Sequence, residues 1–353
     1  MRIGLIAPPW VPVPPVGYGG TEAVVDNLAR GLSERGHDVR LFTVGESTCP
    51  VPRAFLHPYA VQPIGDAVAE AAHVLAAYRE LARMDVIHDH TVLGPLLAGR
   101  HTADLPPVVV TSHGPFSAES RRIFAEIARA ARVVAISRAQ ARQAAGVRIA
   151  AVIHHGIDLD RYQTGAGTGG YLLFLGRMCP DKGVHRAVRI ARDAGVPLRI
   201  VTKIWEAPER EYYEREVRPL LEPGAPEPAE QSSQRCLELL GGARALLNPI
   251  SWAEPFGLVM AEALACGTPV ITTACGAAPE IVEHGRTGFV CHSDQEMTAA
   301  VARLAGIDRQ ACREAAERHF SRERMARDHE RLYAEVIAGA RGVAPPRVHP
   351  VPA

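Results

Sequence analysis

Two carboxylates and a helix start stand together in the stretch Trp252–Gly267. Glu254 precedes an apolar, alanine-rich run that predicts a helix, and Glu262 lies in the early turns of that run. Pro255 fixes its own φ angle, and Gly257 allows the backbone to come close to a ligand. Acids beside a helix N-terminus, which attracts anions, suit a ligand with phosphates at one end and hydroxyls at the other. A nucleotide-sugar has that shape.

Three amides and two cations are the candidate phosphate contacts. The amides are those of Gly257, Leu258 and Val259, at the start of the predicted helix. The cations, Arg177 and Lys182, flank a turn that directly follows a predicted strand. Arg grips phosphate oxygens bidentately, whereas Lys acts as a point charge. For either cation alone, a solvated position on the surface is a sufficient explanation. The occurrence of both cations at one strand end favours a binding site for a diphosphate.

The chain uses lysine sparingly. Only two of its 39 basic residues are lysines, Lys182 and Lys203. A chain that otherwise uses arginine keeps lysine where a compact ammonium suits the site better than a planar fork. For Lys203, drift in composition is an equally good explanation.

The first strand, loop and helix give another candidate phosphate contact. An apolar strand at 2–7 leads into a Pro/Gly-rich loop that ends in GYGG at 17–20, and a helical pattern follows at 21–35. This order suggests phosphate contact at the helix start. The dinucleotide signature G-x-G-x-x-G fails because Glu22 occupies its third glycine position, so an NAD site is disfavoured.

Three histidines lie at the carboxyl ends of predicted strands. His88 and His90 would point to the same face of one strand, and His113 ends another. In parallel sheets, ligands bind beyond these ends. A metal site is disfavoured because no acidic or cysteine ligand completes the set at the usual spacing. A core position suits His88 better, and a position facing a ligand cleft suits His113.

Continuous apolar strands alternate with helical patterns through both halves of the chain, which predicts an α/β fold with doubly wound parallel sheets. A Gly/Thr-rich linker at Tyr162–Gly170 separates two Rossmann-like domains. The expected parts are domains at 1–164 and 165–320, a final helix within 321–342 and a loose tail at 343–353. The expected strands are 2–7, 38–44, 86–90, 108–113, 132–137, 151–155, 171–176, 198–203, 243–250, 269–273 and 288–291. The expected helices include 21–35, 67–83, 118–131, 184–194, 209–221, 234–240 and 322–338.

Composition excludes several classes of protein. A length of 353 residues gives room for about two domains. A formal net charge of 0 and a pI of about 7.3 give no whole-protein attraction to nucleic acid or acidic membranes. The seven scattered cysteines contain no CxxC pair, which fits reduced thiols and a cytoplasmic location. The start MRIGLIAPPW reads as a strand and not as a signal peptide, and no stretch approaches the ~20 apolar residues of a membrane span.

Taken together, these motifs resemble those of the retaining glycosyltransferases of family 4, which have the GT-B fold. The resemblance covers most of residues 2–290, and its most specific part is the E-x7-E pair of Glu254 and Glu262. The matching pieces are GYGG (17–20), DVIHDH (85–90), VVVTSHG (108–114), HHGIDLDRY (154–162), FLGRMCPDKG (174–183), EPFGLVMAE (254–262), ACGTPVI (265–271) and PEIVEHGRTGF (279–289).

The resemblance implies two Rossmann-like domains that face a cleft, with the final helix returning to the first domain. It implies transfer of a sugar from a nucleotide-diphosphate donor to a hydroxyl of a small-molecule or glycan acceptor, with retention of configuration and without a metal or other cofactor. The implied donor contacts are Gly19, Gly20, Arg177, Lys182, Glu254, Phe256, Gly257, Leu258, Val259 and Glu262, and a departure from the family pattern adds Lys203 to them. The implied catalytic set is His113, Arg177, Lys182 and Glu254. Glu254 would hold sugar hydroxyls, and Glu262 would hold the ribose.

One segment departs from the family pattern. Family members usually have a strand and a Gly-rich, base-reading loop where this chain has only Glu222–Ser233, without an apolar strand. The base, the sugar and the acceptor therefore stay open. Two alternative functions also remain: a relative that does not transfer a sugar, such as a phosphorylase or nucleotide-sugar epimerase, and a degenerate nucleotide-sugar-binding protein.

A second departure from the family pattern concerns Lys203. The family's usual glycine after the strand at 198–201 is replaced by Thr202 and Lys203, which predicts that Lys203 reaches the donor.

Overall fold

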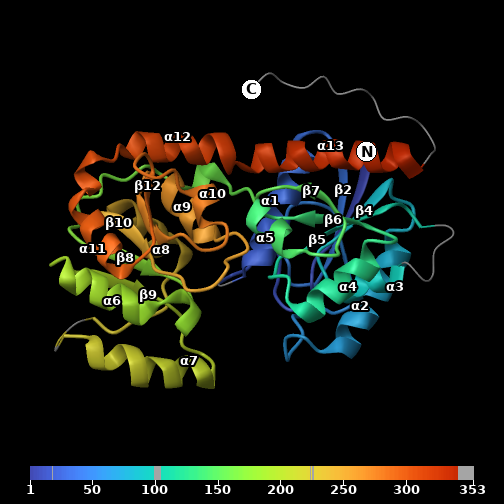
Figure 1. The fold of residues 1–353 in the computed structure, drawn as a ribbon. Coiled ribbons are helices and arrows are strands. Elements are labelled where there is room, and N and C mark those ends of the chain that lie inside the picture. The colour runs from blue at the N-terminus through green and yellow to red at the C-terminus, as the bar shows by residue number, and fades with distance from the viewer. Residues whose placement is uncertain (18, 99–104, 223, 225, 341–353) are drawn as a thin grey trace. The chain divides into compact units, whose positions relative to one another are not determined.

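A computed structural model describes residues 1–17, 19–98, 105–222, 224 and 226–340. The chain divides into two compact units (Figure 1). Unit 1 comprises Met1–Ile136, Ala141–Gly156 and the segment from Arg322 onward, and unit 2 comprises Ser137–Gln140 and Ile157–Ser321. Each unit has one parallel sheet with helices, which confirms the expected α/β fold. The tail at 343–353 lies outside the described residues.

Unit 1 is built on a seven-stranded sheet in the order β3-β2-β1-β4-β5-β6-β7, with every neighbouring pair parallel. Its central strands are apolar runs buried on both faces, as strands covered by helices on both sides must be. The order reverses at β1, which lies between β2 and β4, and ligand sites in such sheets form at that kind of switch point. The strands are β1 (Arg2–Ile6), β2 (Asp38–Thr43), β3 (Arg53–Phe55), β4 (Val86–Asp89), β5 (Val108–Thr111), β6 (Arg132–Ala135) and β7 (Ile149–Val152).

The final helix of the chain belongs to unit 1. It packs along α1, where a Cβ at Gly31 would lie only 2.9 Å from the Cβ of Ala326 (Figure 1). The return of the last helix to the first sheet is therefore confirmed. The helices are α1 (Gly20–Glu34), α2 (Ala67–Glu80), α3 (Leu93–Ala98), α4 (Ala118–Ile127), α13 (Arg322–Ala340) and α5 (Arg138–Gln143), which crosses a boundary between the units.

Unit 2 has a five-stranded parallel sheet in the order β12-β11-β10-β8-β9. Its strands are β8 (Leu172–Leu175), β9 (Leu198–Val201), β10 (Ala245–Asn248), β11 (Val270–Thr273) and β12 (Gly288–Cys291). Its α-helices are α6 (Val184–Asp193), α7 (Ala207–Tyr212), α8 (Ser233–Gly242), α9 (Leu258–Ala265), α10 (Ala278–Ile281), α11 (Asp294–Ala302) and α12 (Arg309–His319). Continuous burial along β10 and β11 again matches a sheet covered on both faces.

Several elements differ from expectation, and the strand β3 and the helix α3 are two that the sequence did not predict. The helix expected over 209–221 is α7 followed by a π-helical turn at Tyr213–Val217 and a 3-10 turn, because Pro219 lacks the N–H that a continuing α-helix needs. The strand expected at 151–155 is β7, which ends at Val152 on the sheet edge. The helix α12, which packs on α9, was not expected.

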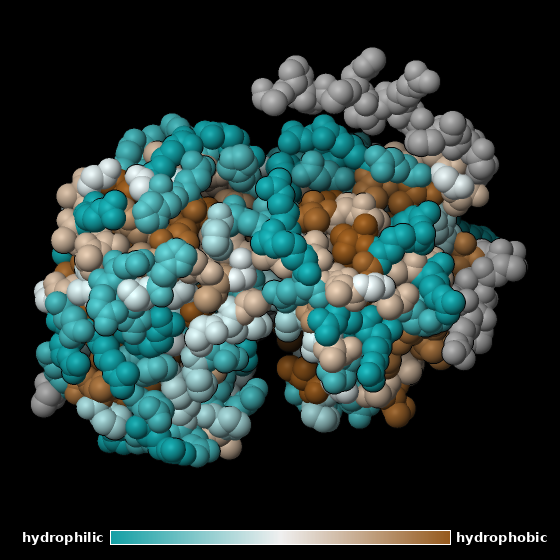
Figure 2. Space-filling view, viewed as in Figure 1, coloured by the Kyte–Doolittle hydropathy of each residue, from teal (hydrophilic) through white to brown (hydrophobic). Residues whose placement is uncertain are grey.

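Figure 2 shows hydrophilic residues over much of the visible face of each unit, interrupted by small hydrophobic areas. Within the part of the chain that the structure describes, no helix is long and apolar enough to cross a membrane.

Candidate functional site

Two loops meet at the carboxyl end of the sheet in unit 2. The loop Arg177–Gly183 follows β8, and the loop Ser251–Gly257 follows β10. Because β8 and β10 are hydrogen-bonded neighbours, both loops leave the same edge of the sheet. The N–H of Ser251 donates to the carbonyl of Asp181 over 2.9 Å and ties the loops together. Lys182 of the first loop therefore lies beside Glu254 of the second.

Lys182 and Glu254 form an ion pair between these loops. Their side chains are only 14% and 11% exposed, so solvent and salt screen the pair weakly. The indole Nε1 of Trp252 donates to the same carboxylate oxygen, Oε2, over 3.0 Å, and Nζ of Lys182 lies 5.2 Å from the Trp252 ring centroid. The other oxygen of Glu254, Oε1, has no hydrogen-bond partner among the described residues. It is available to a ligand hydroxyl.

The main chain of Glu254 is also held in place. The N–H of Ala277 donates to the Glu254 carbonyl over 2.9 Å. A Cβ on Gly276, which has a φ of 56°, would lie 2.3 Å from both the nitrogen and the carbonyl oxygen of Glu254. Only glycine allows this approach, so the turn after β11 fixes the position of the acid.

The start of α9 offers unpaired donors. Gly257, with a φ of 94°, is the N-cap of this eight-residue helix. Gly257, Leu258 and Val259 are half-buried residues, and their N–H groups meet no acceptor within the described chain. They add to the positive end of the helix dipole. The ring of Phe256 is 2% exposed and packs edge-on to Phe320, so only its main chain is accessible to a ligand.

Glu262 lies on α9 and accepts a hydrogen bond of 3.2 Å from the hydroxyl of Tyr162. Burial raises the pKa of Glu262, and the Tyr162 hydrogen bond and the charge of Arg161 oppose that rise. A carboxylate has more acceptor positions than this one bond uses. Glu262 can therefore accept from a ligand hydroxyl as well.

The other predicted cations lie at the ends of neighbouring strands. Arg177 is half-buried after β8. Lys203 follows β9, and its Nζ lies 4.4 Å from the ring centroid of the exposed Trp205. A single parallel bridge between Val201 and Ala229, in the described part of Glu222–Ser233, lies beside them. This bridge occupies the place where the family pattern has a strand.

In unit 1, the glycine loop leads directly into α1. Gly19 is the N-cap of α1, and Gly20 is its first residue. A Cβ on Gly19 would lie 2.7 Å from the Pro15 side chain, so the loop packs too tightly there for a larger residue. Glu22, in the first turn, is 6% exposed, and its burial raises its pKa to about 7. The candidate phosphate contact at this helix start thus lies next to an acid that is protonated in about half of the molecules at pH 7.

The three predicted histidines of unit 1 lie near one another. Nδ1 of His90 and Nε2 of His113 are 2.9 Å apart, because the strands β4 and β5 that precede them are neighbours. His88 is fully buried and hydrogen-bonds to the Tyr333 hydroxyl at 2.6 Å and to Oγ1 of Thr111 at 2.8 Å, which confirms its expected core position. No group of three or more His, Cys, Asp or Glu among the described residues could hold a metal ion.

Comparison with known families decides the class of the chain. The family profile described as Glycosyltransferase Family 4 matches residues 18–161, and that described as Glycosyl transferases group 1 matches residues 158–319. This chain belongs to glycosyltransferase family 4. The resemblance inferred from the motifs is confirmed.

Similar proteins agree with this family. The D-inositol 3-phosphate glycosyltransferase of Actinosynnema mirum is 27% identical over 81% of this chain and 84% of its own. AviGT4, a glycosyltransferase involved in avilamycin A biosynthesis, is 28% identical, with a TM-score of 0.70 over 96% of this chain and 98% of that chain. Anabaena Alr3699/HepE, solved in complex with UDP-glucose, is 19% identical, with a TM-score of 0.72 over 97% of this chain and 99% of that chain, which shows the fold alone. The chain is a glycosyltransferase with the GT-B fold.

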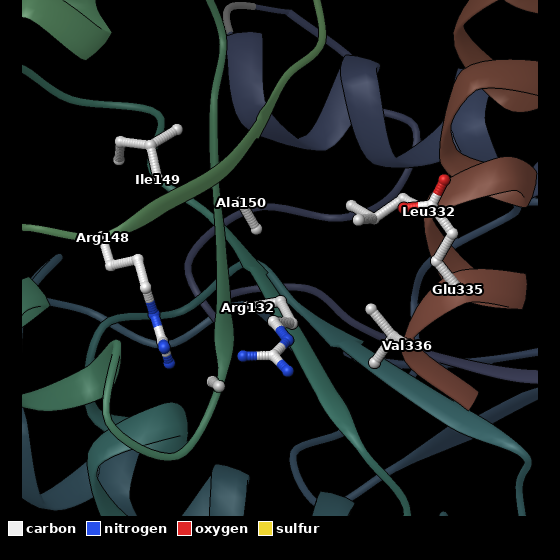
Figure 3. Close-up of a pocket in the computed structure, with 8 residues that line it drawn as sticks. Arg132, Arg148, Ile149, Ala150, Leu332, Glu335 and Val336 are labelled. Carbon is white, nitrogen blue, oxygen red and sulfur yellow. The ribbon is translucent and has the colours of Figure 1, made fainter. Parts of the chain in front are cut away.

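A cavity of about 320 Å³ in unit 1 of this family 4 glycosyltransferase is separate from the candidate site (Figure 3). It is lined by Ala131, Arg132, Arg148, Ile149, Ala150, Leu332, Glu335 and Val336. No residue that the sequence predicts for the site lines this cavity.

Sequence reasoning about this glycosyltransferase missed the residues that support the acids. Trp252 and Tyr162 stand inside or at the end of motifs quoted above, and each donates to one of the two glutamates. Their residue types could have indicated this role, because a buried Trp or Tyr needs a hydrogen-bond partner for its polar atom. Gly276 gave no chemical signal, since its role depends on main-chain packing against Glu254.

Proposed function

We propose that this glycosyltransferase moves a sugar from a nucleotide-diphosphate donor to a hydroxyl of a small-molecule or glycan acceptor, with retention of anomeric configuration and without a metal ion. The observation that carries the proposal is the group formed by Lys182, Glu254 and the unpaired amides at the start of α9. It combines a cation, a helix N-terminus and an acid with a free oxygen. That combination suits a diphosphate followed by sugar hydroxyls.

The proposed chemistry depends on stabilising the leaving group. Lys182, Arg177 and the α9 amides face the diphosphate and supply the electrostatic stabilisation that a metal ion supplies in other transferases. Donor phosphates replace Glu254 as the partner of Lys182, which frees the carboxylate for sugar hydroxyls. The acceptor hydroxyl attacks on the face that the diphosphate leaves, and a departing phosphate oxygen takes up its proton. His113 contacts the reacting sugar, and Glu262 accepts from the ribose.

Further contacts complete the proposal. Gly19, Gly20 and Lys203 approach the donor, and Phe256 contributes only its main chain. The base is left open, because the single bridge at Ala229 stands where a base-reading strand is usual in the family. All seven cysteines are free thiols, which supports the cytoplasmic location proposed here.

The test is a thermal-shift screen of the full chain against UDP-, GDP-, ADP- and dTDP-sugars in EDTA, since a ligand that binds the folded state raises its stability. The best donor is then incubated with hydroxyl acceptors, including an inositol phosphate, and the anomer of the product is read by NMR. We expect at least one donor to raise the Tm and the product to keep the donor's anomeric configuration. Binding without acceptor-dependent product would favour a relative that does not transfer. Failure of every donor to bind would favour a degenerate protein.

A further inference from the structure

Unit 1 contains a cluster of five histidine rings at the carboxyl end of its sheet. The rings of His88 and His90 lie 4.1 Å apart, those of His88 and His329 5.1 Å apart, and those of His113 and His155 5.2 Å apart. Four of the rings are buried, and that of His113 is half-buried. His113 is therefore the member of the cluster that reaches the surface.

Two members of the cluster already have fixed partners. His88 is held between the Tyr333 hydroxyl and Oγ1 of Thr111. Nδ1 of His329 lies 2.9 Å from the Met325 carbonyl, so this nitrogen must carry the proton and donate. Neither ring hydrogen-bonds to His113, and His90 is the ring that does.

The contact between His90 and His113 fixes complementary tautomers. At 2.9 Å, one of the two nitrogens must carry a proton and the other must be bare. Nε2 of His90 is buried without a hydrogen-bond partner within the described chain. A buried N–H without an acceptor is rarer in proteins than a buried acceptor without a donor, so Nε2 of His90 is the bare nitrogen. Nδ1 of His90 then donates to Nε2 of His113.

We infer that His90 is a positioning residue that holds His113 as its Nδ1–H tautomer, so that His113 donates a hydrogen bond to a substrate oxygen and does not act as a base. The inference rests on the proposed function. Nδ1 of His113 meets no partner among the described residues, and the ring lies just beyond the carboxyl end of β5. That is where parallel sheets bind ligands. A neutral donor suits a sugar hydroxyl or ring oxygen better than it suits a phosphate.

The surroundings of His113 keep its ring neutral. Burial and the nearby His329 lower the pKa of His113 to about 4. The other groups that face it from neighbouring elements are the rings of His90 and His155. Behind His155, Arg324 donates to the His155 carbonyl at 2.8 Å, with Asp328 as its counter-ion. These groups add no anion next to His113 that would favour its charged form.

NMR of ¹⁵N-labelled full-length protein tests the tautomer directly and does not depend on activity. We expect His113 of the wild type to be the Nδ1–H form and to stay neutral down to about pH 5, given its pKa of about 4. His90→Phe should leave His113 in mixed tautomers with a higher pKa, whereas His90→Gln keeps an N–H donor and should preserve the wild-type form. An Nε2–H tautomer of His113 in the wild type would overturn the inference even if His90→Phe fails to fold.

Kinetics separate positioning from a general loss of stability. His73→Gln is the matched control, because His73 is a fully buried histidine of unit 1 whose Nε2 contacts the Ala7 carbonyl and whose ring contacts neither His90 nor His113. His90→Phe should lower kcat about tenfold, the equivalent of one hydrogen bond, with a smaller change in donor KM, and should move the acid limb of the pH profile upward. His90→Gln should recover most of that rate, and His73→Gln should change neither kcat nor the profile.

The outcomes distinguish this inference from the proposed function. Equal losses of kcat in His90→Phe and His73→Gln, with an unshifted pH profile, would mean that His90 is merely structural. Wild-type protein that transfers no sugar from any donor would instead overturn the proposed function. The NMR result for His113 would still show whether His90 sets its tautomer.

Discussion

The candidate site of unit 2 and the histidine cluster of unit 1 differ in charge. Unit 2 places an ion pair, Lys182 with Glu254, beside the unpaired amides of α9. Unit 1 instead gathers imidazoles whose pKa values are all lowered, mainly by burial, together with Glu22, whose pKa is raised to about 7. The candidate site of unit 2 thus holds an ion pair, whereas burial favours the neutral form of the imidazoles in the histidine cluster of unit 1.

This difference matches two demands of sugar transfer. Charge develops on the departing diphosphate, and fixed cations and amides stabilise it most strongly in a site that excludes water. A sugar carries no formal charge, so a neutral donor can hold its oxygens while a carboxylate such as Glu254 accepts from its hydroxyls. Under the proposed function, unit 2 therefore supplies charge stabilisation, and the His90–His113 contact of unit 1 supplies a neutral hydrogen bond.

The largest expected effect comes from removing the cation of unit 2. Lys182→Ala should lower kcat by about 10²–10³, because the contact is strongest when charge has built up on the leaving group. Steady-state kinetics with the best donor measures this. Lys203→Ala is the matched control, since it removes the chain's other lysine, which lies against Trp205. Lys203→Ala should lower kcat much less than Lys182→Ala does. Equal losses of kcat in the two variants would show that unit 2 lacks a dominant cation.

The two glutamates should separate in kinetics. Glu254→Gln should lower kcat by roughly 10–100-fold with a smaller rise in KM, because the lost charge faces the sugar as it becomes cationic. Glu262→Gln should raise the donor KM by roughly tenfold at similar kcat, because a ribose contact is equal in ground and transition states. The reverse pattern would mean that Glu262 contacts the sugar and that Glu254 contacts the ribose.

Acid should destabilise unit 1 before unit 2. The folded-state pKa of His329 is about 4, below its unfolded value, so the unfolded chain binds more protons between about pH 6.5 and 4 and stability falls as pH drops through that window. His329 alone should cost roughly 2 kcal/mol between pH 7 and pH 5. Hydrogen exchange resolved by unit measures the effect, and His329→Gln should reduce it. Earlier loss of protection in unit 2 would contradict the contrast between the units.

Glu22 should give an effect of opposite sign and of similar size. Its folded-state pKa, raised to about 7, means that the folded chain binds the proton more tightly, so Glu22 destabilises unit 1 as pH rises from about 4.5 to 7. Glu22→Gln should raise the free energy of unfolding by roughly 1–3 kcal/mol at pH 8 and by little at pH 4. Urea unfolding at the two pH values measures this. An equal change in the free energy of unfolding at both pH values would mean that Glu22 does not titrate between them.

The sequence was sufficient for the fold and for the elements that carry the site. Apolar runs and strand–loop–helix order predicted both sheets except for the short edge strand β3, because these signals are local. The ion pair between Lys182 and Glu254 was not predicted, since its partners are 72 residues apart and meet only when β8 and β10 pair. The His90–His113 contact was hidden for the same reason. Sequence spacing suggested a metal as the alternative, whereas the sheet places the two rings within hydrogen-bond distance.

The central claim is that Lys182, Glu254 and the start of α9 bind a nucleotide-diphosphate sugar without a metal. Isothermal titration calorimetry of the best donor into the wild type and Lys182→Ala, both in EDTA, tests it most directly. The account predicts that the wild type binds in EDTA and that Lys182→Ala weakens the Kd by roughly 10–100-fold, as expected for a lost hydrogen bond to a charged group. Binding that requires Mg²⁺ or Mn²⁺, or a Kd that is unchanged in Lys182→Ala, would contradict the account.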